Sequence, residues 1–169
     1  EDIDAVTKCL ESNWTGIGKN VTVFEQQFRE RLGSEHFMMV DSGSNALYLA
    51  IKNLHLPIGG ELILPSFTWV SCAQAVLLNG LVPVFCDVDL QTQNVTAELI
   101  AEKVTNKTAA IMVVHYAGLP VTMQPILALG FPVIEDAAHA VDSTVPLDQL
   151  IESDPMEYQL TRRLQSDWV

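Results

Sequence analysis

Three short polar segments could carry chemistry, because each follows an apolar run that predicts a β-strand. They are Asp41-Ser42-Gly43-Ser44-Asn45, Pro65-Ser66-Phe67-Thr68-Trp69 and Glu135-Asp136-Ala137-Ala138-His139. In a doubly wound parallel sheet, ligands gather at the carboxyl ends of the strands. We therefore take these three segments as the candidate site.

The first segment is suited to binding an anion. Gly43 permits close approach of the backbone, the serine hydroxyls can donate hydrogen bonds, and the following helix offers free N–H groups at its N-terminus. The alternative is an ordinary turn in which Ser44 is the helix N-cap. Taken alone, a Ser-Gly-Ser sequence favours the turn.

The other two segments offer a flat ring and a carboxylate. Trp69 could stack on a planar ligand, although an isolated tryptophan more often lies in a core or an interface. Asp136 stands at the tip of a buried strand, where a carboxylate requires a cationic or hydrogen-bonding partner. Alternatively, Asp136 caps the next helix and His139 is satisfied by local contacts.

Metal binding is not expected. Glu135, Asp136 and His139 form a possible ligand group, but no ligand from a third element is identifiable, and the histidines show no zinc spacing. We expect His115 to be structural and to fix the turn around Gly118.

The elements that position these residues alternate along the chain. Strands are predicted at 36–40, 62–64, 82–86, 109–114 and 132–134, and helices at 46–54, 69–78, 96–104 and 123–129. Two further amphipathic helices precede them, and the second ends at Gly33. Strands that are continuously apolar are covered on both faces. The sequence therefore predicts an α/β fold with three α/β/α layers and a mostly parallel sheet.

The amino-acid composition narrows the classes of molecule that the protein is expected to bind. The 169 residues are 49% hydrophobic, which suits one ordinary domain, and the net charge of −12 argues against nucleic acid or an anionic membrane as partner. No apolar run approaches the roughly 18 residues that span a bilayer. Three widely spaced cysteines without a CxxC pair indicate reduced thiols and a cytoplasmic protein.

Taken together and in order, five segments resemble the DegT-type nucleotide-sugar aminotransferases. They are Ser42–Leu47, Pro65–Ser71, Pro83–Asp89, His115–Gly118 and Val133–Ala140, within a resemblance that runs from about Ile3 to Thr144. Members of that family are pyridoxal-phosphate (PLP) enzymes of the aspartate-aminotransferase fold, fold type I. The resemblance implies that residues 1–144 are a partial large cofactor-binding domain.

The resemblance also implies roles for five residues. Gly43 and Ser44 would hold the phosphate of PLP, and Trp69 would stack on its ring. Asp136 would pair with the protonated ring nitrogen, and His139 would lie near the 3-hydroxyl. The implied reaction moves an amino group from glutamate to the keto carbon of a nucleotide-linked sugar, in a homodimer.

The chain also departs from the family pattern. The Schiff-base lysine of the family lies beyond the Glu-Asp-Ala-Ala segment, whereas the last lysine here is Lys107, so no catalytic lysine is assigned. Residues 145–169 are interpreted as an acidic tail or a displaced segment. We favour a truncated or gapped version of a full enzyme over a short relative that has lost catalysis.

Three other functions compete with the aminotransferase interpretation. A related sugar dehydratase belongs to the same family. A non-catalytic ligand-binding or dimerisation module would keep the sheet without the chemistry. A dinucleotide-binding domain is disfavoured because no GxGxxG follows the first strand.

Overall fold

Four apolar segments pair into one sheet in the computed structural model, which describes residues 1–141, 143 and 144. The strands are β1 (Glu61–Pro65), β2 (Val82–Cys86), β3 (Thr108–Val114) and β4 (Val133–Asp136). Their order is β2-β1-β3-β4, and every neighbouring pair is parallel. The predicted parallel sheet is therefore confirmed.

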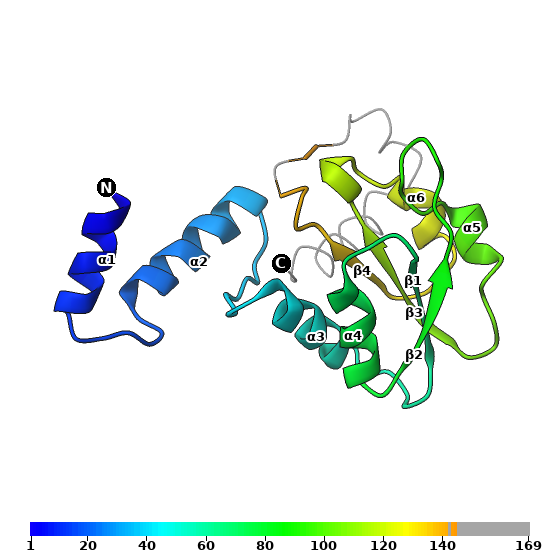
Figure 1. Cartoon of the computed structure of the whole chain (residues 1–169), viewed down its shortest axis with the longest axis horizontal. Coiled ribbons are helices and arrows are strands. Elements are labelled where there is room, and N and C mark those ends of the chain that lie inside the picture. Colours follow the sequence, from blue (N-terminus) through cyan, green and yellow to red (C-terminus); the bar gives the residue numbers. More distant parts are fainter. Residues whose placement is uncertain (142, 145–169) are drawn as a thin grey trace.

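Helices cover both faces of this sheet (Figure 1). Successive strand residues point to opposite faces, so Leu62 and Leu64 pack under α3 (Gly43–Asn53) and α4 (Val70–Leu78). Ile63 packs on the other face, in the cluster that contains residues of α5 (Ala97–Ala101) and α6 (Met123–Leu127). The three-layer α/β/α arrangement follows from these two cores.

Two of the helices, α3 and α5, begin at short polar residues whose side chains cap them. Ser42 has extended backbone angles and its hydroxyl accepts a hydrogen bond from the N–H of Asn45 at 3.3 Å, so Ser42 is the N-cap of α3. The expectation that Ser44 is the cap is wrong by two residues. Thr96 caps α5 in the same way, through the N–H of Leu99 at 3.4 Å.

The predicted strand at 36–40 does not form. Phe37 packs instead against the phenylalanines that precede it, with a ring-centroid distance of 5.0 Å to Phe28. The N–H of Met39 donates to the Glu25 carboxylate at 2.9 Å. This segment therefore finds both its apolar contact and a hydrogen-bond partner on the preceding helix, and it pairs with no strand.

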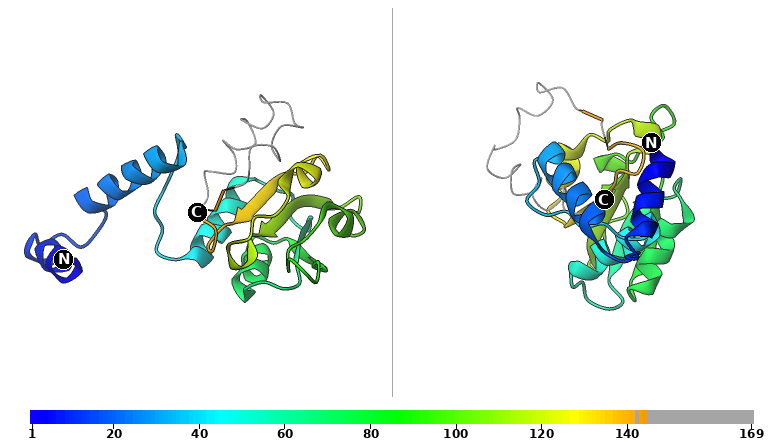
Figure 2. Two further views of the ribbon diagram at one scale, coloured as in Figure 1. Left: turned by 90° about the horizontal axis from the view of Figure 1, so that it is seen from above. Right: turned by 90° about the vertical axis from the view of Figure 1, so that its left-hand side faces the viewer.

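Residues 1–33 form a separate feature, which we call the arm. It consists of α1 (Asp2–Glu11) and α2 (Lys19–Leu32), which extend away from the sheet (Figures 1 and 2). Neither helix has a buried residue, and α2 ends as predicted at Gly33, whose φ is +64°. Within the described residues, no helix combines the length and hydrophobicity of a membrane span. The predicted acidic tail, 145–169, lies outside the described residues.

Candidate functional site

The strand order creates a site at the carboxyl edge of the sheet. From β1 the chain moves to β2 on one side, and β3 and β4 then extend the sheet on the other. Such a reversal opens a crevice between the two central strands, beyond their carboxyl ends. A cavity of about 640 Å³ lies there.

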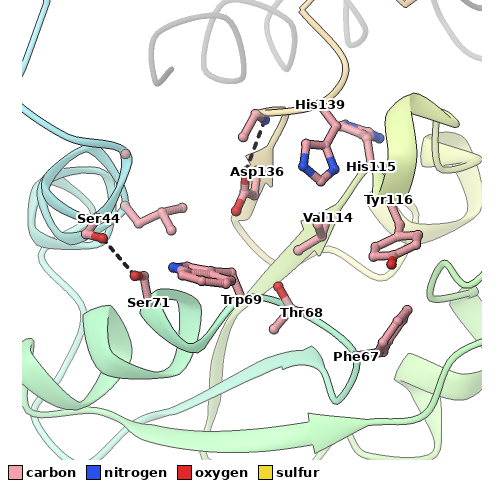
Figure 3. A pocket seen from close by; sticks show the side chains of 13 residues that line it. Ser44, Phe67, Thr68, Trp69, Ser71, Val114, His115, Tyr116, Asp136 and His139 are labelled. Carbon is pink, nitrogen blue, oxygen red and sulfur yellow. Dashed lines mark hydrogen bonds between the residues drawn. The ribbon is translucent and has the colours of Figure 1, made fainter.

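All five residues predicted for the site line this cavity (Figure 3). They are Gly43, Ser44, Trp69, Asp136 and His139, and they come from α3, the β1–α4 junction, the end of β4 and the turn after β4. Figure 3 shows Ser44 and Ser71 on one side, Asp136 and His139 on another, and Trp69 between them. Segments separated by almost a hundred positions thus meet at one place, while the ligand roles of these residues stay predictions.

One wall of the cavity is the start of α3. Gly43 and Ser44 are its first two residues, and amide N–H groups at these positions have no partner within a helix. A Cβ added at Gly43 would meet no atom within 4 Å, so its backbone faces open space. The Ser44 hydroxyl lies 2.7 Å from the hydroxyl of Ser71, which is 6% exposed. This wall therefore presents two amide N–H groups and one hydroxyl, which the helix and Ser71 hold in fixed positions.

Trp69 supplies an open aromatic surface. It occupies the N-cap position of α4 with extended backbone angles and is 73% exposed. This exposure rules out the core interpretation of Trp69. Its ring is available to stack on a planar molecule in the cavity.

The Asp136 carboxylate has one donor on each oxygen. Oδ1 accepts the N–H of Ala138 at 3.1 Å, and Oδ2 accepts the thiol of Cys72 at 3.5 Å. Turns, not a helix, follow at 138–141, so Asp136 does not act as a helix cap. Within the described part of the chain, no cationic side chain is paired with it. The carboxylate is thus oriented by two hydrogen bonds and has no ion-pair partner among the described residues.

Glu135 points to the opposite face of the sheet. Its carboxylate accepts from Nε2 of His115 at 2.8 Å, and Nδ1 of His115 accepts the N–H of Val121 at 3.0 Å. Since Nδ1 is an acceptor, the ring proton resides on Nε2. His115 is 6% exposed, and its contacts with Val121 and Gly118 are consistent with the expected structural role, although its ring also borders the cavity. Within residues 1–141, 143 and 144, no group of three or more acidic, histidine or cysteine side chains is placed to hold a metal.

His139 is positioned by the turn around Gly118. Gly118 has a φ of +84°, and a Cβ on it would lie 2.9 Å from the carbonyl oxygen of His139. The Ser143 hydroxyl donates to the Gly118 carbonyl at 2.7 Å. The ring of His139 meets Tyr116 edge-on at 6.3 Å. Two loops are thereby held together at the mouth of the cavity.

Cys72 and Ser71 are site residues that the sequence analysis missed. Burial, reinforced by the charge of Asp136, raises the pKa of the Cys72 thiol from 9.0 to about 11. The thiol also lies 3.1 Å from the hydroxyl of Thr68, four residues earlier and just before α4 begins. The signal in the sequence was the place of Cys72, three residues after Trp69 at the start of a predicted helix.

Comparison with known proteins gives close relatives across most of the chain. A dTDP-4-dehydro-2,3,6-trideoxy-D-glucose 4-aminotransferase of Saccharopolyspora spinosa is 38% identical in an alignment of 151 residues that covers 86% of this chain and 39% of that protein. The chain thus spans about two fifths of the length of this curated relative.

Solved structures agree with this. An aminotransferase from Psychrobacter cryohalolentis matches with a TM-score of 0.80 and 37% identity, over 84% of this chain and 38% of that one. A GDP-4-keto-6-deoxymannose-3-dehydratase, solved with a trapped PLP-glutamate geminal diamine, matches with a TM-score of 0.78 and 30% identity, over 84% and 39% of the two chains.

The model of the DegT/DnrJ/EryC1/StrS aminotransferase family matches residues 1–148. This match covers most of the sequence and includes every strand of the sheet and every wall of the cavity described above. The chain belongs to the DegT/DnrJ/EryC1/StrS aminotransferase family.

Proposed function

We propose that this chain is the cofactor-binding part of a PLP-dependent aminotransferase that moves an amino group from glutamate to a nucleotide-linked keto sugar. The observation that carries the proposal is the convergence of Asp136, Trp69 and the start of α3 on one cavity. The relatives support the substrate class, since one is a dTDP-sugar 4-aminotransferase and another was solved with PLP and glutamate.

The residues present fit PLP in the nature of their groups. The amide hydrogens of Gly43 and Ser44 suit a phosphate, and the exposed ring of Trp69 suits a flat pyridine. The Asp136 carboxylate, with no cation paired to it among the described residues, suits a protonated ring nitrogen. His139 stands beside them at the mouth of the cavity, where we propose that it lies near the 3-hydroxyl.

When bound, PLP supplies an electron sink for the carbon atom that loses or gains the amino group. The chain supplies the rest of what we propose. Asp136 keeps the ring nitrogen protonated by its negative charge, and the bonds from Ala138 and Cys72 hold that carboxylate in place. Trp69 covers one side of the ring and limits its rotation. No residue of this chain is assigned as the proton-transferring lysine.

The test uses the intact protein that carries this chain. Incubation with PLP, glutamate and a dTDP-linked 4-keto sugar is expected to give 2-oxoglutarate and an aminated sugar, both identified by mass spectrometry. Asp136→Asn should abolish both products while PLP-free protein keeps its melting temperature. Formation of neither product by the wild-type protein with any dTDP- or GDP-linked keto sugar would contradict the proposal.

A sugar dehydratase is the second candidate, favoured by the similarity to the GDP-4-keto-6-deoxymannose-3-dehydratase. The same experiment separates the two. A sugar that loses a hydroxyl and gains no nitrogen identifies a dehydratase. PLP or nucleotide-sugar binding without either product identifies a non-catalytic module.

We further propose a cytoplasmic homodimer. The arm supports this, because its helices bury nothing and expose apolar side chains such as Ile3, Val6 and Leu10. The three cysteines are all free, as suits a reducing compartment. Sedimentation of the intact protein should give twice the chain mass, and a stable monomer would contradict the dimer.

A further inference from the structure

Among the described residues, the thiol of Cys72 is the donor to the Asp136 carboxylate that comes from outside β4 and the turn after it. Cys72 lies on α4 and is fully buried, whereas Asp136 ends β4, so the Sγ–Oδ2 contact at 3.5 Å joins residues 64 positions apart. The other donor, the N–H of Ala138, lies two residues from Asp136 itself. The side chain of Cys72 therefore ties the carboxylate to α4, beneath the wall of the cavity that Trp69 and Ser71 form.

The direction of these hydrogen bonds follows from counting hydrogens. A thiol carries one hydrogen, and a carboxylate can only accept, so the Cys72 hydrogen is committed to Asp136. The Thr68 hydroxyl, 3.1 Å from the same sulfur, must then donate to it. Two hydrogen bonds therefore follow one another: the Thr68 hydroxyl donates to the Cys72 sulfur, and the Cys72 thiol donates to the Asp136 carboxylate.

We propose that Cys72 is a positioning residue for Asp136, whose S–H fixes the carboxylate so that it meets the ring nitrogen of the bound cofactor. This inference rests on the proposed function, since it concerns how the same site holds PLP. Cys72 itself does not touch the cofactor. It acts through the direction that it gives to the Asp136 carboxylate.

The experiment compares binding of two ligands to the intact, cofactor-free protein, measured by calorimetry. The ligands are PLP and its analogue in which the ring nitrogen is replaced by C–H. Their affinity ratio reports the contact of Asp136 with the ring nitrogen alone. We expect Cys72→Ala to lower this ratio about fivefold, the size of one weak hydrogen bond to a charged group. Cys72→Ser, which keeps a donor, should restore it to within about twofold.

Cys86→Ala is the matched control. Cys86 is equally buried, but it lies on the other face of the sheet and its thiol contacts the carbonyl oxygen of Asp87. Its removal leaves a comparable cavity in the core and should leave the affinity ratio unchanged. A general loss of stability would lower the affinity for both ligands in both alanine variants and would leave their ratio the same.

A second measurement needs no cofactor. The S–H stretching band of Cys72 in the infrared spectrum, identified by its loss in Cys72→Ser, should shift when Asp136 is replaced by Asn. The band of Cys86 should not move. This measurement decides the matter if Cys72→Ala fails to fold, because Asp136→Asn leaves the thiol in place.

The outcomes are distinct. An unchanged affinity ratio in a folded Cys72→Ala, or an S–H band insensitive to Asp136→Asn, overturns the role of Cys72. A wild-type protein that binds both ligands equally, or binds neither, overturns the proposed use of PLP. In that case a band that still shifts shows that the Cys72–Asp136 contact exists without serving that cofactor.

Discussion

The two faces of the sheet at the tip of β4 treat adjacent carboxylates in opposite ways. Asp136 faces α3 and α4, borders an open cavity and has no paired cation among the described residues. Glu135 faces the other side and is closed off by the buried ring of His115. The alternation of one strand thus separates a carboxylate available to a ligand from one used for the fold.

This contrast teaches that the role of a charged residue at a strand end, in ligand binding or in the fold, follows from its hydrogen-bond partners and not from its position in the sequence. His115 has both ring nitrogens hydrogen-bonded, so its environment is complete. The site face has groups without partners in the described structure, since Trp69 is exposed and the N-terminus of α3 faces open space. Substitutions on the two faces should therefore affect different properties.

The largest difference is expected from Asp136→Asn in the intact protein. Asparagine has nearly the same shape but cannot stabilise a protonated ring nitrogen, so aminotransferase activity should fall by at least about a hundredfold. The melting temperature should change little, because no cation loses its partner. Steady-state assays and thermal melts test this. Retained activity would remove Asp136 from its proposed role.

Glu135→Ala should show the reverse pattern. It leaves the buried Nε2–H of His115 without an acceptor, which is expected to lower the free energy of unfolding by about 1–3 kcal/mol. Urea denaturation measures this loss, and PLP affinity of the folded protein should stay near that of wild type. Glu135→Gln, which keeps an acceptor oxygen, is the control and should lose less. A variant with full stability and weakened PLP binding would break the contrast.

Trp69→Leu should have a smaller effect, confined to binding. Loss of the stacking surface is expected to weaken PLP binding by about 1 kcal/mol, or roughly five- to tenfold. Stability should not fall, because the ring is already exposed. Trp14→Leu is the matched control, since Trp14 is also exposed but lies on the arm. Equal losses of affinity in both variants would show that Trp69 has no special contact.

The smallest difference between the two faces is expected in how their buried thiols, Cys72 and Cys86, change the stability with pH. Burial raises the pKa values of Cys72 and Cys86 from 9.0 to about 11. The unfolded chain therefore releases these protons first as pH rises. Stability from each thiol is complete below pH 9 and is lost between pH 9 and about 11.

Denaturation at several pH values tests this symmetry. Cys72→Ala and Cys86→Ala should each reduce the loss of stability between pH 9 and about 11, and by similar amounts. A flat pH dependence in the wild-type protein would contradict the burial of both thiols. A marked difference between the two variants would show that the faces differ here as well.

The sequence predicted the sheet better than it predicted the cavity. Predicted and observed bounds of β2 coincide, because an apolar run flanked by turn residues is a local signal. The segment at 36–40 has the same signal, but Phe37 packs on α2 instead. Strand formation requires a neighbouring strand, which a local pattern does not reveal.

The walls of the cavity show the same limit. The five predicted site residues were found by resemblance to known motifs, and all of them line the cavity. Ser71 and Cys72 were missed, because their partners lie 27 and 64 positions away. The N-cap of α3 was assigned to Ser44 instead of Ser42, since both are serines beside a glycine and only backbone angles distinguish them.

β4 is the last of the four strands to be synthesised, yet it ends with Asp136. β1, β2 and β3 carry most of the strand residues in both cores, so they can pair without β4. A chain in which β4 has not paired lacks the carboxylate and the His139 turn at the cavity. Because a ligand stabilises only the state that binds it, a small molecule that bound in this cavity would favour chains in which β4 has docked on β3.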